Sequence, residues 1–148
     1  MPRAKSLRTL QELPTVKGFR PLWMRTNNRR AITLNLEEYE VIRLIDYENL
    51  IQEQVAELMN VSRPTVTRIY ESARRKLGTA IVEGRTFVIE GGDVQMARTY
   101  YQCEDCQHRI ALDPHDERPE LCPTCGSDRI ISLADCFIRG CRRCRRCK

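Results

Sequence analysis

Eight cysteines lie in the last 46 residues of this 148-residue sequence. The first four form two C-x2-C pairs separated by fifteen residues, and they are Cys103, Cys106, Cys122 and Cys125. Each pair can form a tight turn that presents two sulfurs to one ion, and this spacing is typical of a four-thiolate zinc ribbon. Gly126 directly follows the second pair and allows the backbone bend that such a turn requires. We therefore expect zinc at this first site.

The segments that must position these cysteines favour short strands. Alternating side chains at 99–102, 109–112 and 129–133 predict three of them. A module this small cannot build a sufficient core, so metal binding would supply much of its folding energy. The pattern resembles zinc ribbons of the rubredoxin-knuckle type. Two disulfides are the alternative, which the lack of a secretion signal disfavours, and His108 and His115 are expected to be surface residues rather than ligands.

The remaining four cysteines suggest a second site, formed by Cys136, Cys141, Cys144 and Cys147. Zinc and an iron–sulfur cluster both suit four closely spaced thiolates, and redox-active or unliganded thiols are a third alternative. Thirteen residues can hardly bury a cluster. For either metal, the excess negative charge of four thiolates would be balanced by the basic residues of the same segment, which are Arg139, Arg142, Arg143, Arg145, Arg146 and Lys148.

Composition places the chain among soluble globular proteins, with 41% hydrophobic and 30% charged residues. No stretch approaches the length of a membrane helix, and the N-terminus lacks the apolar run of a signal peptide, so we expect a cytoplasmic protein with no membrane partner. The sequence contains no Gly-rich phosphate loop, nucleophile elbow, metalloprotease motif or paired catalytic carboxylates. We therefore expect no enzymatic activity.

The net charge of +5 is unevenly distributed. Residues 1–30 carry +7 and residues 136–148 carry +6, whereas the segments between them are neutral or acidic. Two basic ends favour contact with a polyanion, and solvated tails are the alternative. Together with the cysteine positions, this predicts four parts: a basic extended arm (1–30), a helix-turn-helix domain (31–92), a zinc-ribbon-like domain (93–135) and a basic cysteine-rich tail (136–148).

Three helices are expected in the second part. Asn35 can cap the first, with Glu38 completing a capping box, and the apolar pattern continues to about Tyr47. A second helix is expected over Gln52–Met59, and Asn60 after it tolerates the left-handed conformation of a tight turn. The third helix is expected to begin after Ser62 and to stop at Gly78 or to continue through Glu83, before a strand at 86–89.

The third helix has two different faces. Val66, Ile69, Tyr70, Ala73 and Leu77 fall on one side and predict a core-facing stripe. The remaining surface offers side chains that bind base edges or phosphates in a DNA major groove, namely Arg63, Thr65, Thr67, Arg68, Glu71, Ser72 and Arg75. The alternative is a plain three-helix bundle in which Glu71 and Arg75 form a solvent-exposed ion pair.

Residues 19–92 resemble a family of small prokaryotic proteins of unknown function that are described as predicted DNA-binding proteins. The most specific part is the core VSRPT…SARRK, and the helix-turn-helix of this family resembles region four of the housekeeping sigma factors. The resemblance implies a DNA-binding fold and no particular activity. This chain departs from the expected pattern at Ile51, where a Ser or Thr cap would open the second helix.

These observations predict a mainly α helix-turn-helix domain with a three-helix core, followed by a small β zinc-ribbon-like domain. The expected function is sequence-specific binding of double-stranded DNA by a transcriptional regulator. RNA polymerase or another protein is a candidate partner of the ribbon, and a homodimer is the usual state of such regulators. The alternatives are a zinc-ribbon adaptor that binds protein or RNA without reading DNA sequence and, less favoured, a redox or cluster-carrying enzyme.

Overall fold

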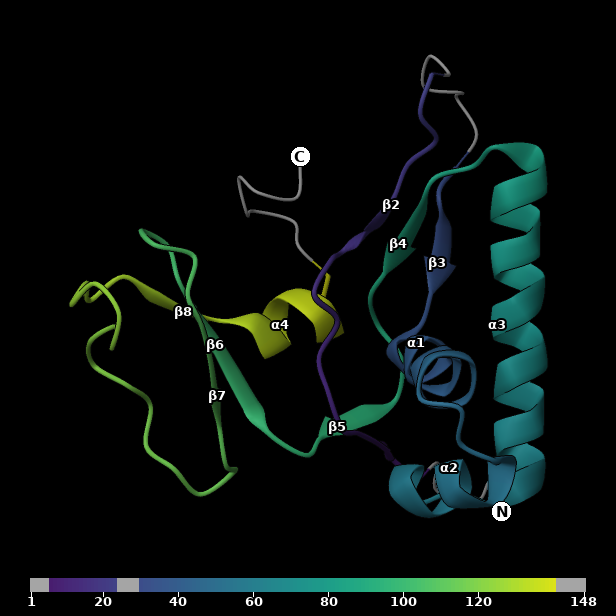
Figure 1. Ribbon diagram of the computed structural model, residues 1–148, viewed down its shortest axis with the longest axis horizontal. Helices are drawn as coiled ribbons and strands as arrows, with labels where there is room; N and C mark the ends of the chain where they lie inside the picture. The colour runs from purple at the N-terminus through teal and green to yellow at the C-terminus, as the bar shows by residue number, and fades with distance from the viewer. Residues whose placement is uncertain (1–5, 24–29, 141–148) are drawn as a thin grey trace.

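The computed structural model describes residues 6–23 and 30–140. Four α-helices and eight strands form this described part (Figure 1). The helices are α1 (Leu36–Ile42), α2 (Gln52–Met59), α3 (Arg63–Glu83) and α4 (Leu133–Ile138), and a π-helical segment (Arg43–Tyr47) continues α1. The strands are β1 (Arg8–Leu10), β2 (Gly18–Phe19), β3 (Ile32–Leu34), β4 (Phe87–Ile89), β5 (Val94–Met96), β6 (Thr99–Cys103), β7 (Arg109–Leu112) and β8 (Ile130–Ser132).

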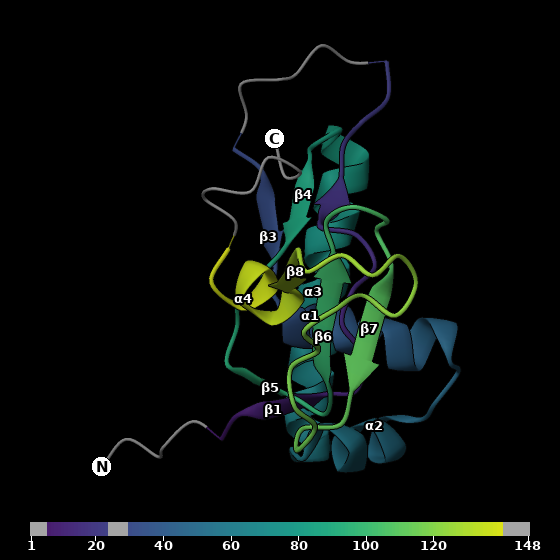
Figure 2. The ribbon, with the colours of Figure 1, turned by 90° about the vertical axis from the view of Figure 1, so that its left-hand side faces the viewer.

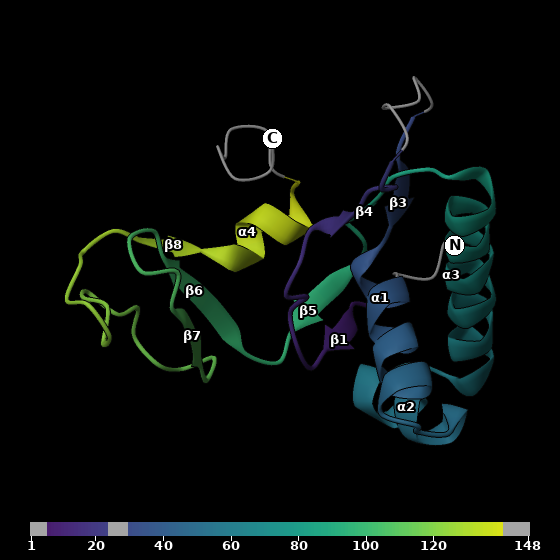
Figure 3. The same cartoon turned by 45° about the horizontal axis from the view of Figure 1, so that its top comes forward.

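The strands form three small sheets rather than one. β1 and β5 pair in parallel, and β4 lies between β2, which is antiparallel to it, and β3, which is parallel. The third sheet, with the order β7-β6-β8, is antiparallel throughout and lies on the opposite side of the molecule from α3 (Figures 1 and 3). The prediction of a mainly α domain with a three-helix core is therefore wrong, because strands from both ends of the described chain enter the same mixed α/β structure.

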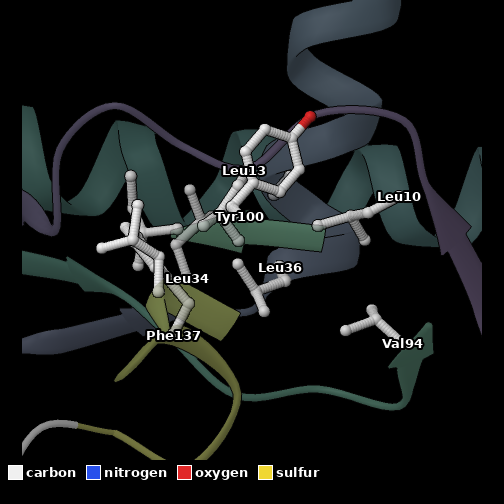
Figure 4. Close-up of a cluster of buried hydrophobic side chains, with 10 residues drawn as sticks. Leu10, Leu13, Leu34, Leu36, Val94, Tyr100 and Phe137 are labelled. Atoms are coloured by element: carbon white, nitrogen blue, oxygen red, sulfur yellow. The ribbon is translucent and has the colours of Figure 1, made fainter. Parts of the chain in front are cut away.

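The packing of the core explains this difference. The largest buried cluster combines side chains from the N-terminal segment, β3, β4, α1, α3, β5, β6 and α4 (Figure 4). Its buried members are Leu10, Leu13, Leu34, Leu36, Ala73, Ile89, Val94, Tyr100, Leu133 and Phe137. The helices share a second, separate cluster of Val41, Leu44, Val55, Ala56, Met59 and Val66. Apolar contacts between residues that are distant in sequence therefore determine the architecture, and helix periodicity does not predict such contacts.

The N-terminal segment is extended, and it is built into the structure. Leu10 is fully buried, and β1 is paired along its length with β5. The backbone N–H of Gln11 donates to Glu40, a fully buried carboxylate whose two oxygens each lie 3.0 Å from nitrogens of Arg43. This paired carboxylate connects α1 to the N-terminal segment.

The first two helices begin at the expected residues, and the start of α2 lacks a capping Ser or Thr. The backbone N–H of Asn35 donates to Glu38 Oε2 at 2.8 Å, and α1 begins at the next residue. α2 spans Gln52–Met59 as predicted, and its first turn is closed by a hydrogen bond from the Ile51 N–H to Gln54 Oε1. Asn60 adopts the left-handed conformation, with φ 54° and ψ 49°. Gln54 thus supplies the N3 half of a capping box, although the Ile51 side chain offers no acceptor for the other half.

The third helix takes the longer of the two extents that the sequence allows. Ser62 Oγ accepts from the Thr65 N–H, which caps the start of α3 as expected. The helix continues through Gly78 and ends at Gly84, whose φ of 60° suits a left-handed C-terminal cap. Ala80 is buried on the inner side, so packing outweighs the helix-weakening effect of Gly78. No helix within residues 6–23 and 30–140 is both long and apolar enough to cross a membrane.

Candidate metal centre and candidate nucleic-acid interface

The four cysteines of the first predicted site lie together. Their sulfurs are all within 4.8 Å of one another, and no other side chain of the described residues belongs to the group. Cys103 Sγ lies 3.6 Å from Cys125 Sγ, and Cys106 Sγ lies 3.5 Å from Cys122 Sγ. A disulfide bond is about 2.05 Å long, so these four residues are free thiols rather than two disulfides. The cluster can hold a metal ion.

The distances suit tetrahedral coordination. Four sulfurs about 2.3 Å from one ion lie about 3.8 Å apart, which is close to the observed spacing. Cys103 and Cys122 are buried, whereas Cys106 and Cys125 are exposed, so the site lies at the surface with one closed side. His108 and His115 do not belong to the group, as expected. The structure leaves the identity of the metal open.

Two tight turns present the cysteines. β6 ends at Cys103, where the carbonyl oxygen accepts a hydrogen bond from the Gln107 N–H at 3.1 Å. The second turn repeats this arrangement, with the Gly126 N–H donating to the Cys122 carbonyl at 2.8 Å. Gly126 has a φ of 74°, which confirms the predicted role of this glycine in the bend.

A polar contact joins the two turns, and no local sequence pattern predicts it. Asp105, between the first two cysteines, accepts hydrogen bonds from Ser127 and from the guanidinium of Arg129. Arg129 immediately precedes β8 and lies opposite Asp105 only after the chain has folded. The contact holds the two cysteine pairs in register from outside the cluster.

The protein environment favours a thiolate at one of the buried ligands. Burial raises the pKa of the Cys122 thiol, but backbone hydrogen bonds from Cys125 and Thr124 outweigh this effect and lower the pKa to about 6. A thiolate is the form that binds metal ions. The backbone hydrogen bonds of this turn therefore favour the metal-binding form of Cys122.

Only one residue of the second predicted site can be placed. Cys136 is half-buried and lies in α4. The other three proposed ligands, Cys141, Cys144 and Cys147, lie outside the described residues. The structure therefore neither brings these four cysteines together nor separates them.

Five of the seven predicted DNA-contacting residues are exposed, and three of these, Arg68, Glu71 and Arg75, lie on the outer face of α3 without an ion-pair partner among the described residues. Arg68, Glu71 and Arg75 are exposed, whereas Val66 and Ala73 on the inner face are fully buried. α3 stands at the edge of the molecule, with α1, β3 and β4 on one side of it only (Figure 1). Within the described residues, no ion pair joins Glu71 to Arg75, so both charges point to solvent.

The other four predicted residues have partners inside the molecule. Thr65 Oγ1 lies 2.8 Å from Ser62 Oγ at the start of α3. Thr67 Oγ1 donates a 2.7 Å hydrogen bond to Gln52 Oε1 at the start of α2. Ser72 Oγ donates a hydrogen bond to Glu38 Oε1 at 2.6 Å. Arg63 forms a 3.0 Å ion pair with Glu53, and both side chains of this pair are exposed.

A shallow pocket of about 290 Å³ lies beside this face and brings in a residue from the N-terminal segment. Its lining is Arg8, Glu37, Glu38, Thr65, Arg68, Ile69 and Ser72. Arg8 thus lies near Arg68, although it also pairs with Asp93 at 3.4 Å. Burial raises the pKa of the Glu37 carboxyl above its ordinary value. Arg8 belongs to the segment 1–30, which was expected to be a basic extended arm and of which residues 6–23 and 30 are described.

Comparison with known proteins identifies relatives along most of the chain. A family model described as "Protein of unknown function DUF134" matches residues 1–97. A UPF0251 protein of Chloroherpeton thalassium is 40% identical over 133 residues, which cover 90% of this chain and 87% of that protein. A UPF0251 protein of Methanothermobacter thermautotrophicus is 38% identical over 130 residues, covering 88% and 67% respectively. A third, from Halothermothrix orenii, is 33% identical over 132 residues, covering 87% and 98%.

These relatives extend the similarity beyond the family model. Because almost nine-tenths of this chain is covered in each case, the matched region continues past residue 97 and includes the two cysteine pairs of the first site. The resemblance to a family of unknown function is thereby confirmed. The chain belongs to the DUF134 family, together with the UPF0251 proteins.

Proposed function

We propose that this protein is a cytoplasmic transcriptional regulator that binds double-stranded DNA through the outer face of α3. The observation that supports this most directly is the exposed row of Arg68, Glu71 and Arg75 on a helix that projects at the edge of the molecule. Arginine pairs with guanine through two hydrogen bonds, and glutamate accepts from the amino group of cytosine. The row therefore offers both donors and acceptors to base edges.

The dimensions of α3 suit a major groove. An α-helix with its side chains is about 10 to 12 Å across, which matches the major-groove width of about 12 Å. With 21 residues, α3 is about 31 Å long and can extend along the groove. In helix-turn-helix proteins the first turns of the second helix contact the bases and the preceding helix crosses the backbone. α2 and α3, which are joined through the left-handed Asn60, would place Arg68 in the groove in this way.

Basic side chains near this face would contact phosphates. Arg63 lies at the start of α3, and its ion pair with Glu53 is exposed on both sides, so a phosphate can replace the carboxylate at little cost. Arg8 lines the pocket next to Arg68 and extends the positive surface toward β1. Such contacts would fix the position of the protein on DNA, whereas Arg68 and Glu71 would read the sequence.

We further propose zinc as the metal of the first cysteine site. Four thiolates at tetrahedral spacing are the usual ligand set of structural zinc, which would stabilise the small third sheet. For the second set of cysteines, zinc and an iron–sulfur cluster remain the two candidates. Zinc is colourless, so a broad visible absorption band in anaerobically purified protein that is lost in Cys144→Ser would identify the cluster.

The function is tested by selection of DNA from a random library, followed by titration of the best duplex and a scrambled duplex at several salt concentrations. We expect tighter binding to the selected duplex, and a linear decrease of the logarithm of affinity with the logarithm of salt concentration for both. Failure to enrich any duplex would contradict the proposal. Equal binding of RNA or of a protein partner, without DNA sequence preference, would favour the adaptor function, in which the acidic ribbon is the contact surface.

A further inference from the structure

A cavity of about 480 Å³ lies where the third sheet and α4 meet the N-terminal segment. Its volume is within the range of small-molecule binding sites in proteins, about 300 to 1,000 Å³. Three parts of the chain that are distant in sequence line it, namely the segment after β1, β6 with β7, and β8 with α4. The backbones of α4, β6 and the segment after β1 lie near one another in both Figure 1 and Figure 2. The cavity is on the other side of the molecule from the outer face of α3.

The walls of this cavity are mostly apolar, with two cationic side chains. The apolar part consists of Val16, Ile131, Leu133 and Phe137. Lys17 is one of the two cations, and its charge is already balanced: Nζ lies 3.2 Å from Glu90 Oε2 and donates to the Cys136 carbonyl at 2.8 Å. Lys17 is therefore a poor anchor for a second anion.

Arg109 is the other cation and, unlike Lys17, it forms no ion pair with a carboxylate of the described residues. Its Nη2 donates to the Pro14 carbonyl at 2.6 Å, and its guanidinium lies 5.5 Å from the centre of the Tyr100 ring. Its Nε is buried without a hydrogen-bond partner. Burial lowers the pKa of Arg109 and outweighs the attraction of the more distant Glu12, which is the expected effect when a buried cation has no carboxylate at ion-pair distance. An anion beside this guanidinium would remove that penalty.

We propose that this cavity binds an amphipathic carboxylate, whose apolar body lies against Val16, Leu133 and Phe137 and whose carboxylate pairs with Arg109. One uncompensated cation matches one negative charge. A phosphate ester would bring a second negative charge for which the cavity offers no second unpaired cation. Such a ligand would contact the N-terminal segment, the third sheet and α4 together, and it would strengthen the junction between the cysteine module and the rest of the protein.

The proposal is tested with octanoate as the probe and octan-1-ol as its uncharged counterpart, titrated calorimetrically into the full metal-loaded chain. Arg109→Gln removes the charge, and Arg98→Gln is the matched control, because Arg98 is an exposed arginine of the same module that does not line the cavity. We expect octanoate to bind, octan-1-ol to bind more weakly, and Arg109→Gln to weaken octanoate binding by about tenfold or more. Arg98→Gln should leave the affinity unchanged.

A second variant keeps Arg109 and fills the cavity. Val16 is 42% exposed, so Val16→Trp can place its ring over the cavity without disturbing the core, and it should abolish octanoate binding. Methyl resonances of Ile131 and Leu133 should shift on addition of octanoate to the wild type. Absence of binding to the wild type, equal affinity for octan-1-ol, or undiminished binding by Val16→Trp would overturn the proposal. If Arg109→Gln does not fold, the Val16→Trp titration decides.

Discussion

Ser72 Oγ donates a 2.6 Å hydrogen bond to Glu38 Oε1, and this contact ties the middle of α3 to the first turn of α1. The Lys76 ammonium reinforces it, because Nζ lies 2.7 Å from the second oxygen of the same carboxylate. Two side chains of α3 are thus occupied in holding the helix in place. Ser72, which sequence analysis grouped with the DNA-contacting residues, is better placed to orient α3 than to read bases.

We therefore expect Ser72→Ala to affect stability and not sequence preference. Loss of the hydrogen bond should lower the free energy of unfolding by about 1 kcal/mol, since the Glu38 carboxylate keeps its contacts with Lys76 and the Asn35 N–H. Urea denaturation measures the first effect, and titration of selected and scrambled DNA measures the second. A change in base preference at constant stability would show that Ser72 contacts DNA directly.

The buried carboxylate of Glu40 provides a stronger test of the fold. Glu40 is fully buried and bonded to Arg43 and to the Gln11 N–H, so Glu40→Ala leaves a largely buried guanidinium without its main partner. Breaking such a pair costs about 3 to 5 kcal/mol. Glu48→Ala is the matched control, because Glu48 pairs with the same arginine but is 45% exposed, and it should cost less than about 1 kcal/mol. Similar losses in both variants would contradict this account.

Metal binding at the first site predicts a local effect of Cys125→Ser. The variant should lose about one zinc equivalent per chain, and amide hydrogen exchange should accelerate over residues 103–130. Protection within α2 and α3 should persist, because their buried cluster shares no residue with the cysteine site. Elemental analysis and hydrogen exchange followed by mass spectrometry provide the readouts. A variant that keeps full metal content and native protection would rule out these ligands.

The pH dependence of stability should reflect Glu37. Burial is the main cause that raises the pKa of its carboxyl above the ordinary value of 4.5. As pH rises through 4.5 the unfolded chain loses its Glu37 proton first, so ionisation favours unfolding until the folded carboxyl also ionises. Glu37→Gln cannot ionise.

The unfolding free energy of Glu37→Gln minus that of the wild type should therefore become more positive between about pH 4 and about pH 7. Parallel denaturant titrations of the two proteins across this interval measure the difference, and any effect of pH on the metal site cancels between them. A difference that does not vary with pH, or that decreases as pH rises, would contradict the proposed burial of this carboxyl.

Local features of the structure could be predicted from sequence where a few adjacent residues determine them. The start of α3 depends on Ser62 and Thr65, the turn before it depends on Asn60, and the cysteine turns depend on C-x2-C spacing and Gly126. Each of these signals lies within a few residues of the structure that it specifies. The predicted boundaries of α2 and of the β6 and β7 segments were accurate for the same reason.

Features that depend on distant residues could not be predicted. β1 pairs with β5 across more than eighty residues, and α4 packs on the core formed around Leu10 and Leu36. The mixed α/β architecture follows from these contacts, so a reading based on helix periodicity wrongly favoured a mainly α fold. The same limit applies to the candidate interface, because neither the Glu38 partner of Ser72 nor the approach of Arg8 to Arg68 has a local sequence signal.

The central claim is that α3 reads DNA sequence, and Arg68→Ala tests it most directly. Arg68 is exposed, and its recorded contact inside the protein is a marginal 3.5 Å hydrogen bond to Thr65, so its replacement should leave stability unchanged. Affinity for the selected duplex should fall by about 1 to 3 kcal/mol and base preference should relax at one position, while scrambled DNA is bound only slightly less well.

The matched control is Arg98→Ala, which removes an equal charge from an exposed site in the cysteine module. The decisive measurement is the ratio of affinities for selected and scrambled duplexes at one salt concentration in wild type, Arg68→Ala and Arg98→Ala. The account predicts that this ratio falls in Arg68→Ala alone. An unchanged ratio in Arg68→Ala, or an equal decrease in Arg98→Ala, would contradict sequence reading by α3.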